Sequence, residues 1–221
     1  MSIVFRKARS AVTRATSFVR SQRFGADPAR IYHQSFYNDG GFEKTDHSAR
    51  VISDWACRSL APGSLLDLGS GAGHYLRAFA HRGVRVFGLE ASPTGVAASG
   101  DGVLAMNYDL KKPLFLSTRF DIVMCVEVAE HIPKRYSETL VKSICRHASK
   151  YIIFTAAPPG TLGLDHINCQ PEDFWKRMFE RQGFGLRTDL TTELRSVATE
   201  EETADWWKSW AWCFERTPPA S

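Results

Sequence analysis

Short apolar runs alternate with helix-like segments along most of this chain, and this alternation constrains the fold more than any other feature. From about residue 62 onward, each apolar run is followed by a segment whose apolar residues recur every three or four positions. Strands that are joined by crossover helices form a parallel sheet with helices on both faces. The sequence therefore predicts an α/β fold with a doubly wound, mostly parallel sheet.

The same patterns place the individual elements. Strands are expected near residues 64–68, 84–89, 103–106, 120–126, 151–155 and 184–190, with a last strand in the tryptophan-rich stretch 206–214. Helices are expected at residues 43–60, 72–82, 93–99, 134–148 and 171–182, and the acidic residues 200–202 are expected to start a solvated helix. This gives one domain over residues 43–221, preceded by N-terminal helices over residues 1–42.

The first 24 residues form a basic segment that differs from the rest of the chain. Six of the 28 Lys and Arg residues lie there and none of the 24 Asp and Glu residues, so the remainder is close to neutral. The apolar residues of this segment recur at helical spacing, which predicts an amphipathic helix. Such a helix can pack on its own domain, make a peripheral membrane contact, bind phosphate, cap a substrate cleft or act as a transit peptide. The aromatic residues Tyr32, Phe36 and Tyr37 are candidates for core packing or for lining an acceptor pocket.

The composition excludes several classes of protein. No stretch reaches the roughly 18–20 apolar residues that a membrane-spanning helix requires. The five cysteines include no Cys-x-x-Cys pair, which argues against a structural zinc site or a disulfide scaffold and favours a reducing compartment. Since no signal peptide is visible either, we expect a cytoplasmic protein, with membrane association only through residues 1–24.

A glycine-rich turn follows the first predicted strand. Residues 67–73 read Asp-Leu-Gly-Ser-Gly-Ala-Gly, and glycine in such a turn lets the backbone approach a ligand closely. Glu90 ends the second strand, where a carboxylate can accept hydrogen bonds from both hydroxyls of a ribose. This arrangement predicts nucleotide binding.

The spacing of the glycines distinguishes between nucleotides. A dinucleotide fingerprint, Gly-x-Gly-x-x-Gly, needs a third glycine at position 74 or 76, where this chain has His74 and Leu76. Asp67 would repel a pyrophosphate, whereas it suits a ligand that presents an amino group. An NAD-dependent oxidoreductase is therefore disfavoured.

Here the chain resembles the class I S-adenosylmethionine-dependent methyltransferases. Residues 66–73 resemble their first motif, Glu90 the ribose-binding acid, Asn107-Tyr108-Asp109-Leu110 the adenine-contacting motif and residues 120–132 the fourth-strand motif. The resemblance covers about residues 62–215 and implies a Rossmann-like seven-stranded sheet with an antiparallel last strand. It also implies S-adenosyl-L-methionine as methyl donor, held by Asp67, Gly69, Ser70, Gly71, Gly73, Glu90, Ala91, Asp109, Leu110 and Glu127.

Two histidines are candidates for a general base. Methyl transfer from a sulfonium needs donor and acceptor held in line and, for a hydroxyl acceptor, removal of a proton. His131 follows the fourth strand and His166 lies in the loop after the fifth, at the edge where open α/β sheets bind their ligands. We name His166, His131, Glu127 and Glu130 as candidate catalytic residues; an architectural role is the alternative for each histidine.

A second interpretation of these four residues is a divalent-cation site. The small-RNA 3′-terminal ribose methyltransferases have a similar Glu-x-x-Glu-His followed by a distant His, and there a metal orients the ribose hydroxyls. The near-neutral body of this chain disfavours RNA, because RNA binding requires clustered positive charge. We therefore expect neither a metal nor a nucleic-acid partner.

Together these patterns predict a methyltransferase that O-methylates a small molecule, such as a sugar, a glycan or lipid precursor, or a secondary metabolite. His166 is followed five residues later by Pro171-Glu172, a spacing similar to that in O-methyltransferases of quinone pathways. A cofactor-binding protein without catalysis remains an alternative, and the sequence indicates no oligomeric state.

Overall fold

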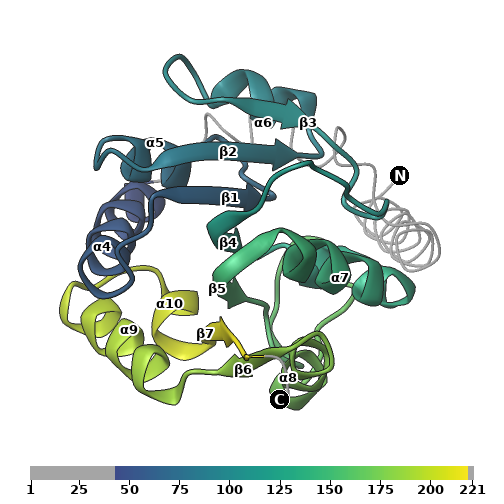
Figure 1. Ribbon diagram of the computed structural model, residues 1–221. Coiled ribbons are helices and arrows are strands. Elements are labelled where there is room, and N and C mark those ends of the chain that lie inside the picture. Colours follow the sequence, from purple (N-terminus) through teal and green to yellow (C-terminus); the bar gives the residue numbers. More distant parts are fainter. Residues whose placement is uncertain (1–42, 219–221) are drawn as a thin grey trace, which may run out of the picture.

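A single seven-stranded sheet organises residues 43–218, the part of the chain that the computed structural model describes (Figure 1). The strands are β1 (Ser64–Leu68), β2 (Arg85–Glu90), β3 (Ala105–Asn107), β4 (Phe120–Cys125), β5 (Ala148–Thr155), β6 (Phe184–Leu186) and β7 (Ala211–Arg216). Their order is β3-β2-β1-β4-β5-β7-β6, and β7 runs antiparallel to β5 and β6 while the other neighbours are parallel. The predicted sheet with an antiparallel last strand is confirmed.

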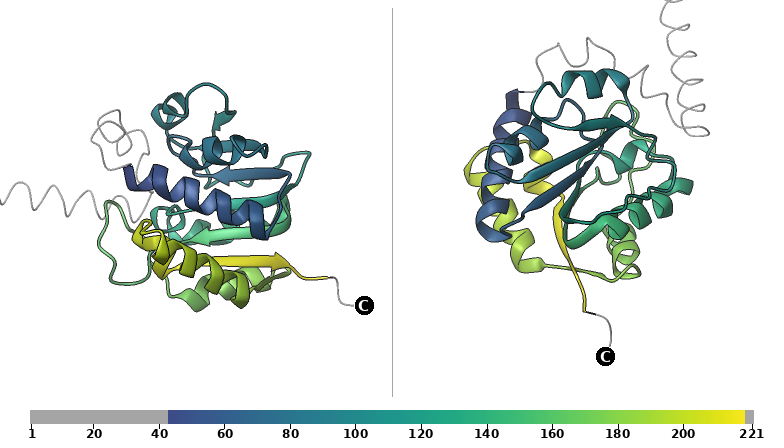
Figure 2. Two further views of the ribbon diagram at one scale, coloured as in Figure 1. Left: turned by 90° about the vertical axis from the view of Figure 1, so that its left-hand side faces the viewer. Right: turned by 45° about the horizontal axis from the view of Figure 1, so that its top comes forward.

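Helices cover both faces of this sheet (Figures 1 and 2). They are α4 (Glu43–Ser59), α5 (His74–Ala80), α6 (Pro93–Ala98), α7 (Ser137–His147), α8 (Glu172–Glu180), α9 (Thr188–Glu200) and α10 (Asp205–Ser209), with 3-10 turns η1 (Ala129–His131) and η2 (Lys134–Tyr136). One apolar core joins the sheet to α4, α5, α9 and α10, and a second joins it to α7 and α8. Within residues 43–218, no helix is long and apolar enough to cross a membrane.

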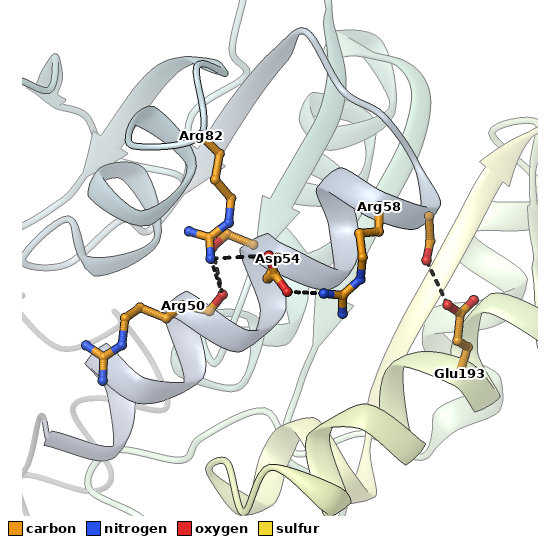
Figure 3. Close-up of polar contacts among 7 residues, drawn as sticks. Arg50, Asp54, Arg58, Arg82 and Glu193 are labelled. Carbon is orange, nitrogen blue, oxygen red and sulfur yellow. Dashed lines mark hydrogen bonds and ion pairs between the residues drawn. The ribbon is translucent and has the colours of Figure 1, made fainter.

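Helix α4 is fixed to the helices on either side of it (Figure 3). Arg82, just after α5, donates to the carbonyl oxygen of Arg50 (3.1 Å) and lies 3.6 Å from the carboxylate of Asp54. At its other side, the hydroxyl of Ser59 donates to Glu193 of α9 (2.7 Å). These contacts are exposed and each contributes little stability, about 0–1 kcal/mol, so burial of the apolar face of α4 carries the packing.

The C-terminal part of the sequence prediction is wrong in three places. The strand expected over residues 184–190 ends at Leu186, and α9 begins at Thr188. Leu190, Leu194 and Ala198 are buried along α9, at a helical spacing that outweighs its threonine-rich composition. Residues 200–202 therefore end a helix instead of starting one, and the stretch 206–214 is divided between α10 and β7.

A smaller correction concerns the helix after the glycine turn. It was expected over residues 72–82, whereas α5 covers only His74–Ala80. Gly69, Gly71 and Gly73 have φ angles of 85°, 52° and 74°, in the left-handed region that a right-handed helix does not use. The chain can become helical only after the last of them. The basic helix expected in residues 1–24, and Tyr32, Phe36 and Tyr37, lie outside the described residues.

Candidate functional site

A cavity of about 410 Å³ lies at the carboxyl ends of β1, β2 and β4. Open α/β sheets bind ligands at this edge, where the strand order reverses. Candidate residues from both halves of the sequence line the cavity: Asp67, Gly69, Ser70, Gly71, Glu90, Ala91, Asp109, Leu110, Glu127, His131 and His166. The structure thus brings together most of the side chains that the sequence predicted. Gly73 and Glu130 do not line the cavity directly.

The glycine turn forms one wall of the cavity with its backbone. The amide groups of Gly69 and Ser70 donate to the carbonyl oxygen of Leu89 at 2.7 and 3.1 Å, which anchors the turn to β2. A Cβ on Gly69 would lie 2.3 Å from a methyl carbon of Val128, so any side chain there would displace Val128 in the segment after β4. Glycine is required at this position by space as well as by backbone conformation.

Glu90 is held rigidly at the end of β2. Its two carboxylate oxygens accept hydrogen bonds from the amide groups of Gly71 (2.8 Å) and Ser92 (2.7 Å). Burial raises the pKa of Glu90 above its ordinary value, whereas these amide donors favour the charged form. Each oxygen keeps a further lone pair, so Glu90 can still accept from ribose hydroxyls. Asn107 donates to the carbonyl oxygens of Glu90 and Ala91, both at 2.9 Å, and fixes the next turn.

Asp67 is a buried carboxyl group facing the cavity from β1. Only 2% of the residue is exposed, and its Oδ2 has no hydrogen-bond partner among the described residues. Burial, followed by the neighbouring charge of Glu90, raises the pKa of Asp67 to about 7. An unpartnered carboxylate oxygen of this kind fits a cationic amino group, which would replace the solvation that burial removes.

Asp109 and Leu110, which follow β3, also line the cavity. Asp109 accepts a hydrogen bond from the amide of Lys111 (3.1 Å), and Leu110 is buried at 5% exposure. Their placement next to Glu90 fits an adenine ring between an apolar surface and a carboxylate. With Asp67 and Glu90, these residues suit the three parts of S-adenosylmethionine: amino acid, ribose and base.

Glu127 follows β4 in an unusual backbone conformation. Its φ angle is 53°, in the left-handed region that non-glycine residues seldom adopt. The hydroxyl of Thr155 accepts from the Glu127 amide and donates to its Oε1, both at 2.8 Å. The indole N–H of Trp210 donates to the same Oε1, also at 2.8 Å. Glu127 is thus fixed by residues of β5 and of the C-terminal segment.

His131 and His166 meet although they are far apart in sequence. Their rings form an edge contact with centroids 5.0 Å apart, and Nδ1 of His131 lies 3.2 Å from the carbonyl oxygen of Asp165. Burial, followed by the neighbouring His166, lowers the pKa of His131 to about 4, so this ring is neutral at physiological pH. A Cβ on Gly163 would lie 2.2 Å from Nε2 of His166, so the missing side chain makes room for that imidazole.

Three of the four residues that the sequence offered as metal ligands come together. Ligand atoms of Glu130, His131 and His166 lie within 4.8 Å of one another, close enough to hold a divalent cation, and Glu127 is not part of this group. Glu130 is completely buried, and its side chain is hydrogen-bonded to that of Glu127. Burial, with a contribution from Glu127, raises the pKa of Glu130 well above its ordinary value. The predicted four-residue convergence is therefore only partly realised.

The sequence did not predict several residues that line or support the cavity. Thr45 at the start of α4, Val128 after β4 and Trp206 of α10 are among its lining residues, and Trp210 supports Glu127. The unusual density of tryptophans after residue 205 is a signal for Trp206 and Trp210, although by itself it favours a strand. Thr45 and Val128 carry no signal that distinguishes them from structural residues.

Comparison with known proteins decides the family. Residues 47–158, about half of the chain, match a family model described as a methyltransferase domain. The chain belongs to this family. The match includes the glycine turn, Glu90, Asp109 and Glu127–His131, but it ends before His166 and Trp210.

Curated relatives of this methyltransferase domain are longer proteins. An uncharacterized methyltransferase of Mycobacterium avium (strain 104) is 32% identical over 117 residues, which cover 49% of this chain and 43% of the relative. A ubiquinone biosynthesis O-methyltransferase of Rhodopseudomonas palustris (strain BisB5) is 33% identical over 112 residues, which cover 48% of this chain and 41% of the relative. The chain therefore matches less than half the length of these relatives.

Solved structures share the fold at low sequence identity. An amino pentose methyltransferase from Micromonospora echinaspora, with bound SAM, is 16% identical and superposes with a TM-score of 0.61 over 84% of this chain and 96% of its own. A sugar N-methyltransferase from Streptoalloteichus is 15% identical, with a TM-score of 0.63 over 84% of this chain and 93% of its own. Both support a Rossmann-like architecture for this methyltransferase domain.

Proposed function

We propose that this chain is an S-adenosylmethionine-dependent methyltransferase that methylates a hydroxyl oxygen of a small molecule. The observation that carries the proposal is that Asp67 and Glu90 share one cavity with the paired rings of His131 and His166. A donor site and a candidate base thus face the same space. The O-methyltransferase among the relatives supports oxygen as the acceptor atom.

The residues on the donor side bind and orient. S-adenosylmethionine, when bound, supplies an electrophilic methyl group on a sulfonium. Glu90 accepts from the ribose hydroxyls, Asp67 pairs with the amino group, and the glycine turn lets the ligand approach the backbone. Because the site is fixed by backbone hydrogen bonds, little entropy is lost when the reactants are aligned, and alignment alone can lower the barrier by ~7–11 kcal/mol.

The residues on the acceptor side remove a proton. His166 is the general base in this proposal, because its imidazole ring lines the same cavity as Asp67 and Glu90. His131 is neutral and packs against His166, so it orients the ring without adding positive charge. A positioned base contributes a factor of roughly 10²–10⁴ to the rate of methylation of a hydroxyl.

The first experiment is calorimetric titration with S-adenosylhomocysteine, S-adenosylmethionine and NAD in parallel. We expect the first two to bind and NAD not to bind. Methyl transfer is then measured with labelled donor and three acceptor classes: a catechol, a sugar with free hydroxyls, and an amino sugar. Labelling of the first or second class supports the proposal. Exclusive labelling of the amino sugar, with the methyl group on its nitrogen, contradicts oxygen as the acceptor, and binding of NAD alone contradicts the whole assignment.

A second candidate is the metal-dependent RNA 3′-terminal ribose methyltransferase that the sequence raised. The cluster of Glu130, His131 and His166 favours it, since carboxylate and imidazole ligands hold divalent cations. The assays above are therefore repeated with EDTA, with Mg²⁺ or Mn²⁺, and with a short RNA that ends in a free ribose. Activity on RNA that requires the metal would replace the first proposal, whereas activity on a small molecule that resists EDTA would exclude the second.

A further inference from the structure

Trp210 does not line the cavity, but it makes a hydrogen bond to a residue that does, Glu127. Trp210 lies between α10 and β7, and its indole N–H donates to Oε1 of Glu127 at 2.8 Å across 83 positions of sequence. The ring is partly buried and packs against the core that joins the sheet to α7 and α8. The next residue, Ala211, begins β7 and pairs with Thr155 of β5, so the indole is held beside the end of β5.

A second donor meets the same oxygen. The hydroxyl of Thr155, the last residue of β5, donates to Oε1 of Glu127 and accepts from the Glu127 amide. Because Thr155 and Trp210 both donate to Oε1 of Glu127, the carboxylate is held in one orientation. Neither of these two bonds involves its Oε2. The left-handed backbone of Glu127 is unfavourable for a residue with a side chain and persists only where its surroundings hold it.

The other tryptophans show that this contact is not a general packing requirement. All six lie in the described residues, and the indole N–H groups of Trp55, Trp175 and Trp212 are buried with no hydrogen-bond partner there. The N–H of Trp207 donates to the hydroxyl of Tyr75 (2.7 Å). Trp210 is thus the tryptophan whose N–H meets a carboxylate of the cavity.

We propose that Trp210 is a positioning residue that, with Thr155, holds the Glu127 carboxylate in its working orientation at the cavity. The indole N–H performs this role, and the ring itself is replaceable. This inference rests on the proposed function, because it assumes that Glu127 serves the ligands of that cavity. It also assigns a role to a residue outside the part of the chain that matches the family model.

The first test measures the hydrogen bond directly by NMR of full-length protein labelled with ¹⁵N. Six indole signals are expected, and Trp210→Phe identifies the one that disappears. In Glu127→Gln the Trp210 signal should move upfield, because a neutral amide oxygen is a weaker acceptor than a carboxylate. The Trp175 signal is the internal control and should stay in place, because this indole has no hydrogen-bond partner among residues 43–218. An unchanged Trp210 signal in Glu127→Gln overturns the proposal.

The reverse experiment asks whether Glu127 depends on Trp210. In Trp210→Phe, which keeps an aromatic ring but loses the donor, the backbone amide signal of Glu127 should shift and exchange faster with solvent. Trp212→Phe is the matched control, since Trp212 is a buried tryptophan of β7 whose N–H has no partner in the described part of the chain. A Glu127 amide that responds equally to both variants indicates a general packing effect and overturns the proposal.

A double-mutant cycle on turnover then tests the functional role. Trp210→Phe should lower kcat by about tenfold, the lower end for residues that orient a functional side chain. In a Glu127→Gln background the same substitution should have no further effect, because Trp210 acts only through that carboxylate. Additive losses overturn the positioning role. If no acceptor is methylated, the proposed function fails, while the two NMR experiments still decide the contact.

Discussion

The halves of the cavity that we propose for the methyl donor and for the acceptor are built in different ways. The donor half comes from residues 67–110, along the consecutive strands β1, β2 and β3, and much of it is backbone. The acceptor half joins Glu127 and His131 after β4, His166 in the loop after β5 and the C-terminal tryptophans. Segments far apart in sequence therefore meet there, and side chains make most of the contacts.

This difference explains which half can be recognised from sequence. A backbone turn needs glycine at fixed spacing, so a few consecutive residues are enough to identify it. A side-chain site depends on which segments the fold brings together, and no local pattern specifies that. The family model likewise covers the whole donor half and ends before His166 and Trp210. If the two halves act separately, substitutions in the donor half should change donor binding, and substitutions in the acceptor half should change turnover alone.

The largest effect is expected in the donor half. Glu90→Ala removes the acceptor for two ribose hydroxyls, each bond to a charged group contributing about 2 kcal/mol, so affinity for S-adenosylhomocysteine should fall about 1,000-fold. It also frees the amides of Gly71 and Ser92, so the melting temperature should fall as well. Calorimetric titration measures the affinity, and Glu180→Ala, an exposed change on α8, is the control. Near-normal binding by the Glu90 variant contradicts the assignment of the donor half.

A smaller effect, confined to turnover, is expected in the acceptor half. His166→Ala removes the proposed base, and kcat should fall about 100-fold. Affinity for S-adenosylhomocysteine should stay close to that of the unmodified protein, since His166 lies with the acceptor residues. His81→Ala is the control, because it replaces a histidine by alanine at a position that does not line the cavity. Full turnover by the His166 variant would show that the base is another group, and weakened binding would show that the halves are not separable.

Sequence reasoning predicted the sheet and the donor half because their signals are local. The alternation of strands and helices, the turn at Gly69 and the acid at Glu90 all follow from neighbouring residues. It missed α9, where threonine-rich composition concealed a helical spacing, and divided the C-terminal tryptophans wrongly. The contact between Trp210 and Glu127 could not be predicted, because it depends on the register in which β7 pairs with β5, where Ala211 lies opposite Thr155.

Gly163 offers a milder change in the acceptor half. A Cβ at this position would overlap the imidazole of His166, whose ring can rotate away at little cost to stability. Gly163→Ala should therefore displace the base without removing it and lower kcat by about tenfold, with an unchanged melting temperature. Gly160→Ala in the same loop tests backbone strain instead, because its φ is 89° and no atom lies near the added Cβ. Equal loss of turnover in both variants would attribute the effect to the loop backbone.

The smallest effect is a pH dependence that belongs to the donor half alone. In the ligand-free protein, burial and Glu90 raise the pKa of Asp67 to about 7, and a cationic amino group binds only the ionised carboxylate. Affinity for S-adenosylhomocysteine should therefore increase with pH, by about threefold between pH 6.5 and 7.5 as the ionised fraction grows. The same raised pKa makes folding of the free protein less favourable as pH rises from about 4 to 7, because the folded state holds the proton more tightly. Asp67→Asn should bind S-adenosylhomocysteine more weakly, and its affinity should lose the threefold rise with pH. A pH profile that is unchanged in Asp67→Asn but altered in His166→Ala would assign the titration to the acceptor half and break the separation between the two.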